Sequence, residues 1–106
     1  MARILINVPK QISSGRPFEV KVLIAHPMET GQRRNDTGEL IPRDIMTDFL
    51  CTLDDEIVLR TELFPAITAN PFFAFFAVAE KSGTLVLTFT GDQGFSQTER
   101  VTITVT

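Results

Sequence analysis

The sequence has almost none of the residues from which small β-proteins build metal centres or disulfides. It contains one histidine, His26, one cysteine, Cys51, and neither tryptophan nor tyrosine. A blue-copper centre needs two histidines and a cysteine, and an iron site of the superoxide-reducing immunoglobulin-like type needs several histidines, so both are excluded. One cysteine also excludes an internal disulfide. We therefore expect a chain without a cofactor.

Long apolar runs and an excess of basic charge are also missing. The longest apolar run, residues 71–79, is far shorter than the ~20 residues of a membrane-spanning helix. Residues 1–7 lack the apolar core of a signal peptide. Ten basic and 13 acidic residues give a net charge of −3, which offers no basic surface for nucleic acid. We expect neither a membrane nor a nucleic acid as partner.

What the sequence does contain is alternation. With 106 residues, 43% of them hydrophobic and 22% charged, the chain is expected to form one globular domain over residues 1–106. Apolar and polar residues alternate with the period of half-buried strands over seven segments, residues 3–8, 18–25, 48–53, 57–63, 72–79, 84–90 and 101–105. Seven short strands predict a seven-stranded immunoglobulin-like antiparallel β-sandwich, with a small barrel as the alternative.

The inward positions of these segments predict the core. They are Val20, Val22, Ile24, Phe49, Cys51, Leu59, Leu87, Phe89 and Ile103. The pattern also places Ile57, Leu59 and Leu63 on one face of their strand. Because Cys51 falls among apolar neighbours, we expect an inert, packed thiol and not a catalytic nucleophile. We therefore predict that the chain is not an enzyme.

The segment Phe72-Phe73-Ala74-Phe75-Phe76 is apolar on both faces. One face of each strand in a two-layer sandwich should meet water, and four phenylalanines cannot all enter so small a core. We therefore predict that part of strand 71–78, including Phe72 or Phe76, forms a partner-binding surface. Leu23 and Leu50 are weaker candidates. Alternatively, the crossover 64–71 or the loop 27–44 covers this face.

Residues 27–44 form a polar loop that is long for so small a chain, and such loops usually bind something. Asn35-Asp36-Thr37-Gly38 at its centre is a good turn sequence, so the loop is expected to fold back as a small hairpin. For contacts to a partner we select the residue directly before the loop, four residues at its start and one in the crossover: His26, Met28, Glu29, Arg33, Arg34 and Asn70. Two alternatives are a copper or small-ligand site built on His26 and Met28, and a His26 that only bonds the backbone.

Several strings in the chain resemble the SoxZ family of bacterial sulfur-oxidation proteins. They are Val22-Leu23-Ile24-Ala25-His26-Pro27-Met28-Glu29-Thr30-Gly31-Gln32-Arg33, Gly38, Ile41-Pro42-Arg43, Phe49-Leu50-Cys51-Thr52 and Pro65-Ala66-Ile67-Thr68-Ala69-Asn70-Pro71-Phe72. Their spacing also agrees with the family, and the resemblance covers nearly the whole chain.

The resemblance implies an immunoglobulin-like subunit that forms a heterodimer with SoxY in thiosulfate oxidation. SoxY carries the sulfur intermediate on a cysteine in a glycine-rich C-terminal arm, and SoxZ is not itself the carrier. The resemblance further implies a periplasmic location reached by export with the signal-bearing partner, and transient contacts with other sulfur-oxidation enzymes. Without its partner, the apolar surface predicted on strand 71–78 should drive self-association of the isolated chain. The predicted C-terminal strand agrees with a role other than that of the carrier. A carrier cysteine needs a mobile segment, and residues 101–106 contain neither a cysteine nor a glycine-rich stretch.

Overall fold

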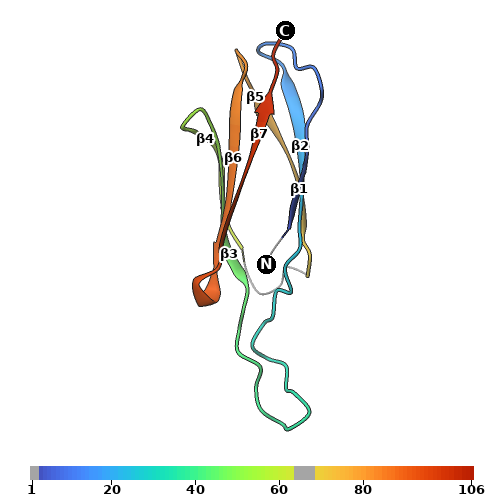
Figure 1. The fold of residues 1–106 in the computed structure, drawn as a ribbon, viewed down its shortest axis with the longest axis vertical. Helices are drawn as coiled ribbons and strands as arrows, with labels where there is room; N and C mark the ends of the chain where they lie inside the picture. Colours follow the sequence, from blue (N-terminus) through green and yellow to red (C-terminus); the bar gives the residue numbers. More distant parts are fainter. Residues whose placement is uncertain (1–2, 64–68) are drawn as a thin grey trace.

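The computed structural model describes residues 3–63 and 69–106, which form a sandwich of two antiparallel sheets (Figure 1). One sheet has the strand order β1-β2-β5 and the other β4-β3-β6-β7. The elements are β1 (Ile4–Asn7), β2 (Pro17–Ile24), β3 (Met46–Leu53), β4 (Glu56–Glu62), β5 (Phe72–Val78), β6 (Gly83–Gly91), the 3-10 turn η1 (Asp92–Gly94) and β7 (Ser96–Ile103). The predicted seven-stranded antiparallel sandwich is confirmed.

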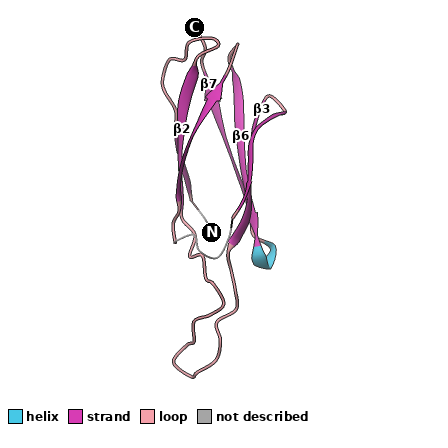
Figure 2. Ribbon diagram, turned by 180° about the vertical axis from the view of Figure 1, so that it is seen from behind, coloured by secondary structure: helices cyan, strands magenta, loops and turns pink. Residues whose placement is uncertain are grey.

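Helix is almost absent from this architecture (Figure 2). Within residues 3–63 and 69–106 the only helical segment is the three-residue turn η1, which is far too short to cross a membrane. The predicted crossover 64–71 falls mostly on residues 64–68, which lie outside the described part of the chain.

The core lies between the two sheets and is centred on phenylalanine. The ring centroid of Phe49 on β3 lies 4.5 Å from that of Phe89 on β6, 5.7 Å from that of Phe73 and 5.9 Å from that of Phe75. Phe73 and Phe75 belong to β5, so these contacts join the two sheets. Of the nine predicted core residues all are buried except Leu59, which is half-buried and packs against the core.

The common face predicted for Ile57, Leu59 and Leu63 is wrong. Cys51 lies opposite Leu59, but its neighbour Thr52 lies opposite Ile57, so the pairing of β3 with β4 shifts by one residue here. A bulge of this kind turns the residues beyond it to the other face of the sheet. The side chain of Ile57 is consequently 64% exposed, whereas Leu63 is buried.

The last strand begins at Ser96, five positions before the predicted segment 101–105. Residues 96–100 are Ser-Gln-Thr-Glu-Arg and show no apolar alternation. They nevertheless pair with β6, from Ser96 opposite Thr90 to Arg100 opposite Val86. Because β7 is an edge strand, the backbone ladder to β6 is enough to hold these polar residues in strand conformation.

The long loop folds back on itself as the predicted hairpin. Bridges join Glu29 to Asp44 and Arg34 to Leu40, and the amide of Gly38 donates to the carbonyl of Asn35 over 3.0 Å at the tip. We call residues 29–44 the arm. The arm extends beyond the ends of both sheets (Figure 1) and gives the molecule its length, with extents of 58 × 21 × 20 Å.

Candidate partner-binding surface

The outer face of the β1-β2-β5 sheet carries a row of apolar side chains. Leu5 on β1 pairs with Leu23 on β2, and Leu23 pairs with Phe72 on β5. The three side chains therefore lie side by side across all three strands, and they are 54%, 40% and 60% exposed. Cross-strand neighbours of this kind are close enough to touch, so the row forms one continuous apolar strip.

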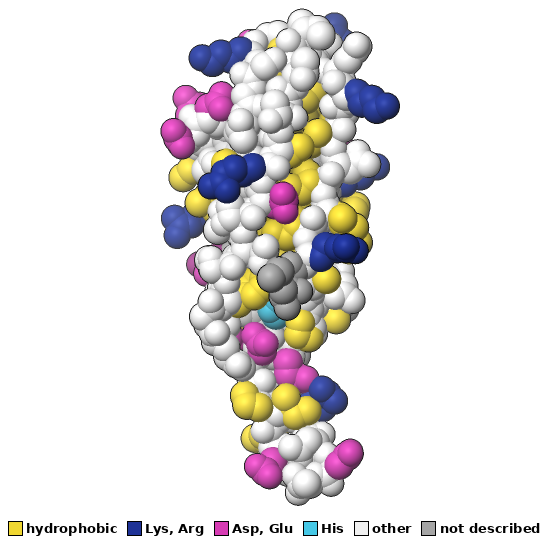
Figure 3. Space-filling model, in the orientation of Figure 1, with side chains coloured by type: hydrophobic (Ala, Val, Ile, Leu, Met, Phe, Trp, Pro, Cys, Tyr) yellow, Lys and Arg dark blue, Asp and Glu magenta, His cyan; other side chains and the backbone are white. Residues whose placement is uncertain are grey.

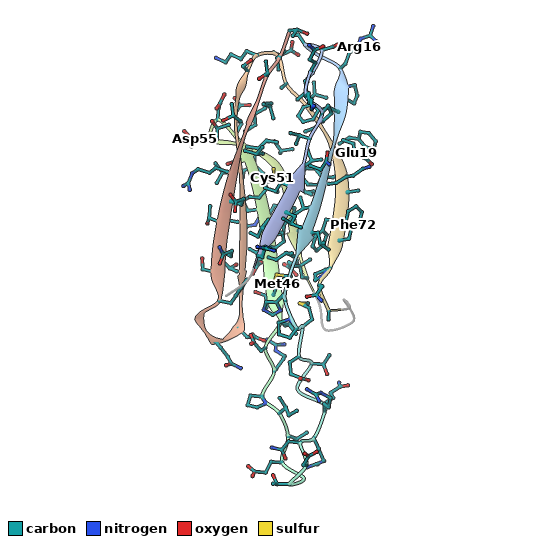
Figure 4. All side chains as sticks on the ribbon, turned by 45° about the vertical axis from the view of Figure 1, so that its right-hand side comes forward. Arg16, Glu19, Met46, Cys51, Asp55 and Phe72 are labelled. Atoms are coloured by element: carbon teal, nitrogen blue, oxygen red, sulfur yellow. The ribbon has the colours of Figure 1, made fainter. Side chains whose placement is uncertain are left out.

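Phe76 and Val78 extend this strip along β5. Both point to the same outer face as Phe72 and are 67% and 51% exposed. The outer apolar face is the name used below for Leu5, Leu23, Phe72, Phe76 and Val78. Figure 3 shows hydrophobic side chains gathered along the molecule, and Figure 4 shows Phe72 on the outer side of its strand while Cys51 lies between the sheets. An apolar surface of this kind on a small protein usually marks a partner contact.

The division of the β5 phenylalanines explains why the face exists. Phe73 and Phe75 reach the core, whereas Phe72 and Phe76 alternate with them and point to solvent. Leu50, a weaker candidate in the sequence, lies on β3 and half-buried in the other sheet. Leu50 therefore cannot belong to the same surface.

His26 and Met28 were selected as surface contacts, but the structure buries both. Their side chains are 4% exposed each. They continue the inward positions of β2, so that residues 20, 22, 24, 26 and 28 are all buried while the residues between them are not. His26 and Met28 therefore offer a partner no side-chain surface in the free chain.

His26 connects the arm to the sandwich. Its Nδ1 accepts the amide of Met28 over 3.0 Å, and its backbone exchanges two bonds with Asn70, one to the side-chain Oδ1 at 2.9 Å and one from the Asn70 amide at 2.8 Å. Phe95 lies edge-on to the imidazole at 4.7 Å. Met28 in turn accepts the amide of Met46 on its sulfur at 3.3 Å. These contacts fix the first strand of the arm.

The second strand of the arm is fixed at the turn after β6. Arg43 donates two bonds to the carboxylate of Asp92, from Nε at 2.7 Å and from Nη2 at 2.8 Å. The same carboxylate accepts the amide of Ile45 at 3.2 Å, and the side chain of Gln93 donates to the carbonyl of Arg43 at 3.0 Å. The bond from Arg43 holds the pKa of Asp92 below its ordinary value. Both strands of the arm are thus anchored at its base.

The charged candidates on the arm are engaged with the arm itself. Arg33 donates from Nη2 to Oε1 of Glu29 at 2.6 Å, and this bond lowers the pKa of Glu29. Arg34 donates to the carbonyl of Gly38 at 2.7 Å. Arg33 is exposed, and an exposed pair of this kind stabilises a fold only slightly. The guanidinium group of Arg33 therefore remains accessible to an anion from solvent.

A metal site has little support in this geometry. No three side chains of the types His, Cys, Asp and Glu gather closely enough to hold a metal within the described residues. Of the atoms that a His26/Met28 copper site could use, Nδ1 and Sδ already accept backbone amides, and Nε2 lies 3.9 Å from Oδ1 of Asp44. Cys51 is buried, and burial raises the pKa of its thiol to about 11. At neutral pH this thiol carries almost no nucleophilic thiolate.

The buried histidine predicts that acid weakens the fold. Burial lowers the pKa of His26 below its ordinary value of 6.5, against the opposing charges of Asp44 and Asp92. The unfolded chain therefore takes up the proton more readily than the folded one, so the free energy of unfolding is full above about pH 6.5 and falls as the pH decreases below it. Urea unfolding at about pH 7.5 and 5.5 measures this change.

A His26→Asn variant serves as the control, since an amide oxygen can replace the acceptor that Met28 uses. Its stability should change much less over the same interval. The carboxyl groups of Glu29 and Asp92, with pKa values lowered from 4.5 and 3.8, affect stability only at still lower pH. An equal loss of stability in the variant would show that His26 is not the titrating group.

Some residues of this surface were not selected from the sequence. Leu5 and Val78 complete the outer apolar face. Leu5 was not selected, and Val78 was covered only by the selected segment 71–78. The signal for both was their position on the outward-facing side of the strand alternation. A shallow depression of about 220 Å³ adjoins the row and is lined by Arg3, Leu5, Leu23, Ala25 and Asn70. Asn70, which was selected, therefore lies beside the outer apolar face as well as against His26. Whether the eight selected residues bind a partner stays a prediction.

Solved structures with the same fold include a sulfur carrier protein and a superoxide reductase. The sulfur carrier protein SoxY from Chlorobium limicola f thiosulfatophilum aligns with a TM-score of 0.67 and 16% identity, over 97% of this chain and 78% of that chain. Superoxide reductase (neelaredoxin) from Ignicoccus hospitalis aligns with a TM-score of 0.72 and 19% identity, over 97% and 80%. At these identities the likeness establishes the fold alone. It confirms the predicted immunoglobulin-like class.

No curated protein sequence matches this chain. The family comparison is more informative, because the model described as sulphur oxidation protein SoxZ matches residues 6–102. The match spans nearly the whole chain and includes the arm, β5 and all of the outer apolar face except Leu5. This chain belongs to the SoxZ family.

Proposed function

We propose that this chain is the non-catalytic subunit of a heterodimeric sulfur-carrier complex and that its outer apolar face binds a SoxY-type carrier. The observation that carries the proposal is the row Leu5, Leu23 and Phe72, exposed side by side on one sheet. Membership of the SoxZ family supports the choice of partner. The carrier would supply the cysteine that holds the sulfur intermediate, on a flexible C-terminal segment of its own.

The composition of the surface fits a protein partner. The apolar side chains form the row Leu5, Leu23 and Phe72 and continue along β5. Glu19 and Lys21 lie beside them on the central strand β2, and Arg3 and Asn70 adjoin the row. Protein interfaces likewise combine apolar anchors with polar and charged contacts. The aromatic anchors Phe72 and Phe76 bury much area with few rotatable bonds, which favours binding.

We further place the complex in the periplasm, in the oxidation of thiosulfate or related sulfur compounds, with export of this chain alongside a signal-bearing carrier. The support for this step is the family membership. Fractionation of cells that express both chains tests the location: this chain should reach the periplasm only when the carrier with its signal is present. Periplasmic recovery of this chain without the carrier would contradict the export route.

Co-expression with a SoxY-type carrier tests the pairing. A tag on the carrier should retain this chain in a 1:1 complex through gel filtration, and an interface of standard size should bury about 1,200–2,000 Å². The copper content of the separately purified chain is measured in parallel. Failure to form the complex, together with stoichiometric copper, would replace the proposal by the metal-binding alternative.

Replacing Cys51 by serine tests the non-catalytic role. The thiol is buried and its pKa is about 11, so it should react slowly with a thiol reagent in the native chain and take no part in sulfur transfer. Serine places a hydroxyl in the core, which lowers the free energy of unfolding by about 1–3 kcal/mol. The Cys51→Ser complex should still support thiosulfate oxidation. Loss of oxidation by a folded, assembled Cys51→Ser complex would make Cys51 part of the mechanism.

A further inference from the structure

One edge of the β1-β2-β5 sheet is unprotected. The two sheets end in four edge strands: β1, β5, β4 and β7. Strand β4 carries Glu56, Arg60 and Glu62, β7 carries Glu99 and Arg100, and β1 has only four residues. Charges and short length are the usual means of preventing an edge from pairing with another chain. Strand β5, with the sequence FFAFFAV, has neither charge nor proline over seven residues.

The backbone of β5 presents a regular set of hydrogen-bonding groups at this edge. The amide of Ile24 donates to the carbonyl of Pro71, which makes these two a hydrogen-bonded pair of the antiparallel ladder. Such pairs alternate along the strand, so Phe73, Phe75 and Ala77 bond to β2. The backbone groups of the four residues between them point away from β2: Phe72, Ala74, Phe76 and Val78. No strand of the described chain lies on that side.

We propose that β5 pairs antiparallel with β5 of a second copy of this chain, so that two β1-β2-β5 sheets join into one six-stranded sheet across a two-fold axis. Each copy would donate and accept through the same outward residues. This pairing is an isologous interface, which closes at two copies and does not grow further. The proposal concerns the chain alone and stands independently of the carrier partner.

The side chains of β5 support a specific register. All four outward residues of each copy pair only when Phe72 lies opposite Val78 and Ala74 lies opposite Phe76 of the second copy. A large side chain then faces a smaller one at every position on the outer face. Aromatic and β-branched residues in direct cross-strand positions stabilise a sheet, and no charge repels its equivalent at the axis because β5 has none.

The edge pairing leaves the outer apolar face accessible. A two-fold axis perpendicular to the sheet places the outer faces of both copies on the same side, so Leu5 and Leu23 remain exposed. The area buried along one strand is smaller than the about 1,200 Å² of a stable interface. The dimer is therefore concentration-dependent and exchanges with free chains.

Sedimentation equilibrium on the isolated chain tests the proposal with two matched variants. Ala74 and Asn7 lie in one cross-strand row, on opposite sides of Lys21, and both are exposed. Ala74→Lys and Asn7→Lys thus add the same charge beside the same lysine, but only the first adds it at the β5 edge. We expect a dimer of twice 11.8 kDa, a dissociation constant raised about tenfold or more by Ala74→Lys, and little change with Asn7→Lys.

Two further measurements separate edge pairing from stacking of the outer faces. Ala74→Pro removes an outward amide without breaking a bond to β2, so it should abolish the dimer while the monomer stays folded. In the wild-type chain the amides of Phe72, Ala74, Phe76 and Val78 should become protected from hydrogen exchange as the concentration rises, whereas that of Phe75 is protected at all concentrations. A monomer at every concentration, open-ended assembly, or equal weakening by both lysine variants would overturn the proposal.

Discussion

Replacing Phe49 by alanine is expected to lower the free energy of unfolding by about 3–5 kcal/mol. The Phe49 side chain is fully buried on β3 and stacks on Phe89 at 4.5 Å, with interplanar angle 17°. It also contacts Phe73 and Phe75, the two residues through which β5 reaches the core. Truncation therefore loses apolar burial and also leaves a cavity where the two sheets meet, because neighbouring rings in a close-packed interior relax only partly.

Urea unfolding followed by circular dichroism measures this loss, with Phe76→Ala as the matched control. Phe76 is 67% exposed on β5, in the other sheet, so the identical truncation should change the stability of the chain by only a few tenths of a kcal/mol. Since a domain of this size is stable by about 5–15 kcal/mol, Phe49→Ala removes a large fraction of the free energy of unfolding. Similar stability of both variants would show that the aromatic cluster is not the centre of the core.

The alternation of the sequence was a reliable guide wherever one face of a strand meets the core. It located all seven strands, and eight of the nine core residues that it predicted are buried. The same alternation would have predicted the burial of His26 and Met28, because both continue the series of inward-facing positions to which Val22 and Ile24 belong. The polar loop that follows them obscured this, because a histidine and a methionine beside charged residues are typical of a surface. The alternation of buried and exposed side chains can therefore continue beyond the last residue that pairs with a neighbouring strand.

Two other features could not be predicted from alternation. The bulge opposite Cys51 adds one residue to β4 and turns Ile57 outward, and no glycine or proline marks it in the sequence. The first half of β7 is held by backbone pairing on an open edge, where polar side chains fit as well as apolar ones. In both places the backbone ladder decided the conformation, and the side chains carried no pattern.

The binding surface was predictable in part. An excess of apolar residues on β5 follows from counting, because four phenylalanines cannot share one inner face. The row that joins Phe72 to Leu23 and Leu5 depends on the register of three strands that are far apart in the sequence. The anchoring of the arm depends likewise on a contact between Arg43 and Asp92, 49 positions apart. Contacts between distant segments need the assembled fold.

Replacing Phe72 or Phe76 by alanine is expected to weaken binding of a SoxY-type carrier by about 2 kcal/mol or more, roughly 30-fold in the dissociation constant, where the residue is a hot spot. Both side chains are more than half exposed and point away from the core. Their truncation removes large apolar area from the interface and little from the folded chain. Phe72 should matter more, because it lies in the row with Leu23 and Leu5, and anchors near the centre of an interface contribute most.

Isothermal titration calorimetry of each variant with the purified carrier measures this effect, and Ile57→Ala is the matched control. Ile57 is an equally exposed apolar residue, 64%, but lies on the opposite sheet. Its replacement should leave affinity unchanged. Because general loss of exposed apolar area would affect all three variants alike, a selective effect of the β5 residues assigns the interface to the outer apolar face. Wild-type affinity in both β5 variants would instead place the carrier elsewhere, and the arm would then be the next surface to test.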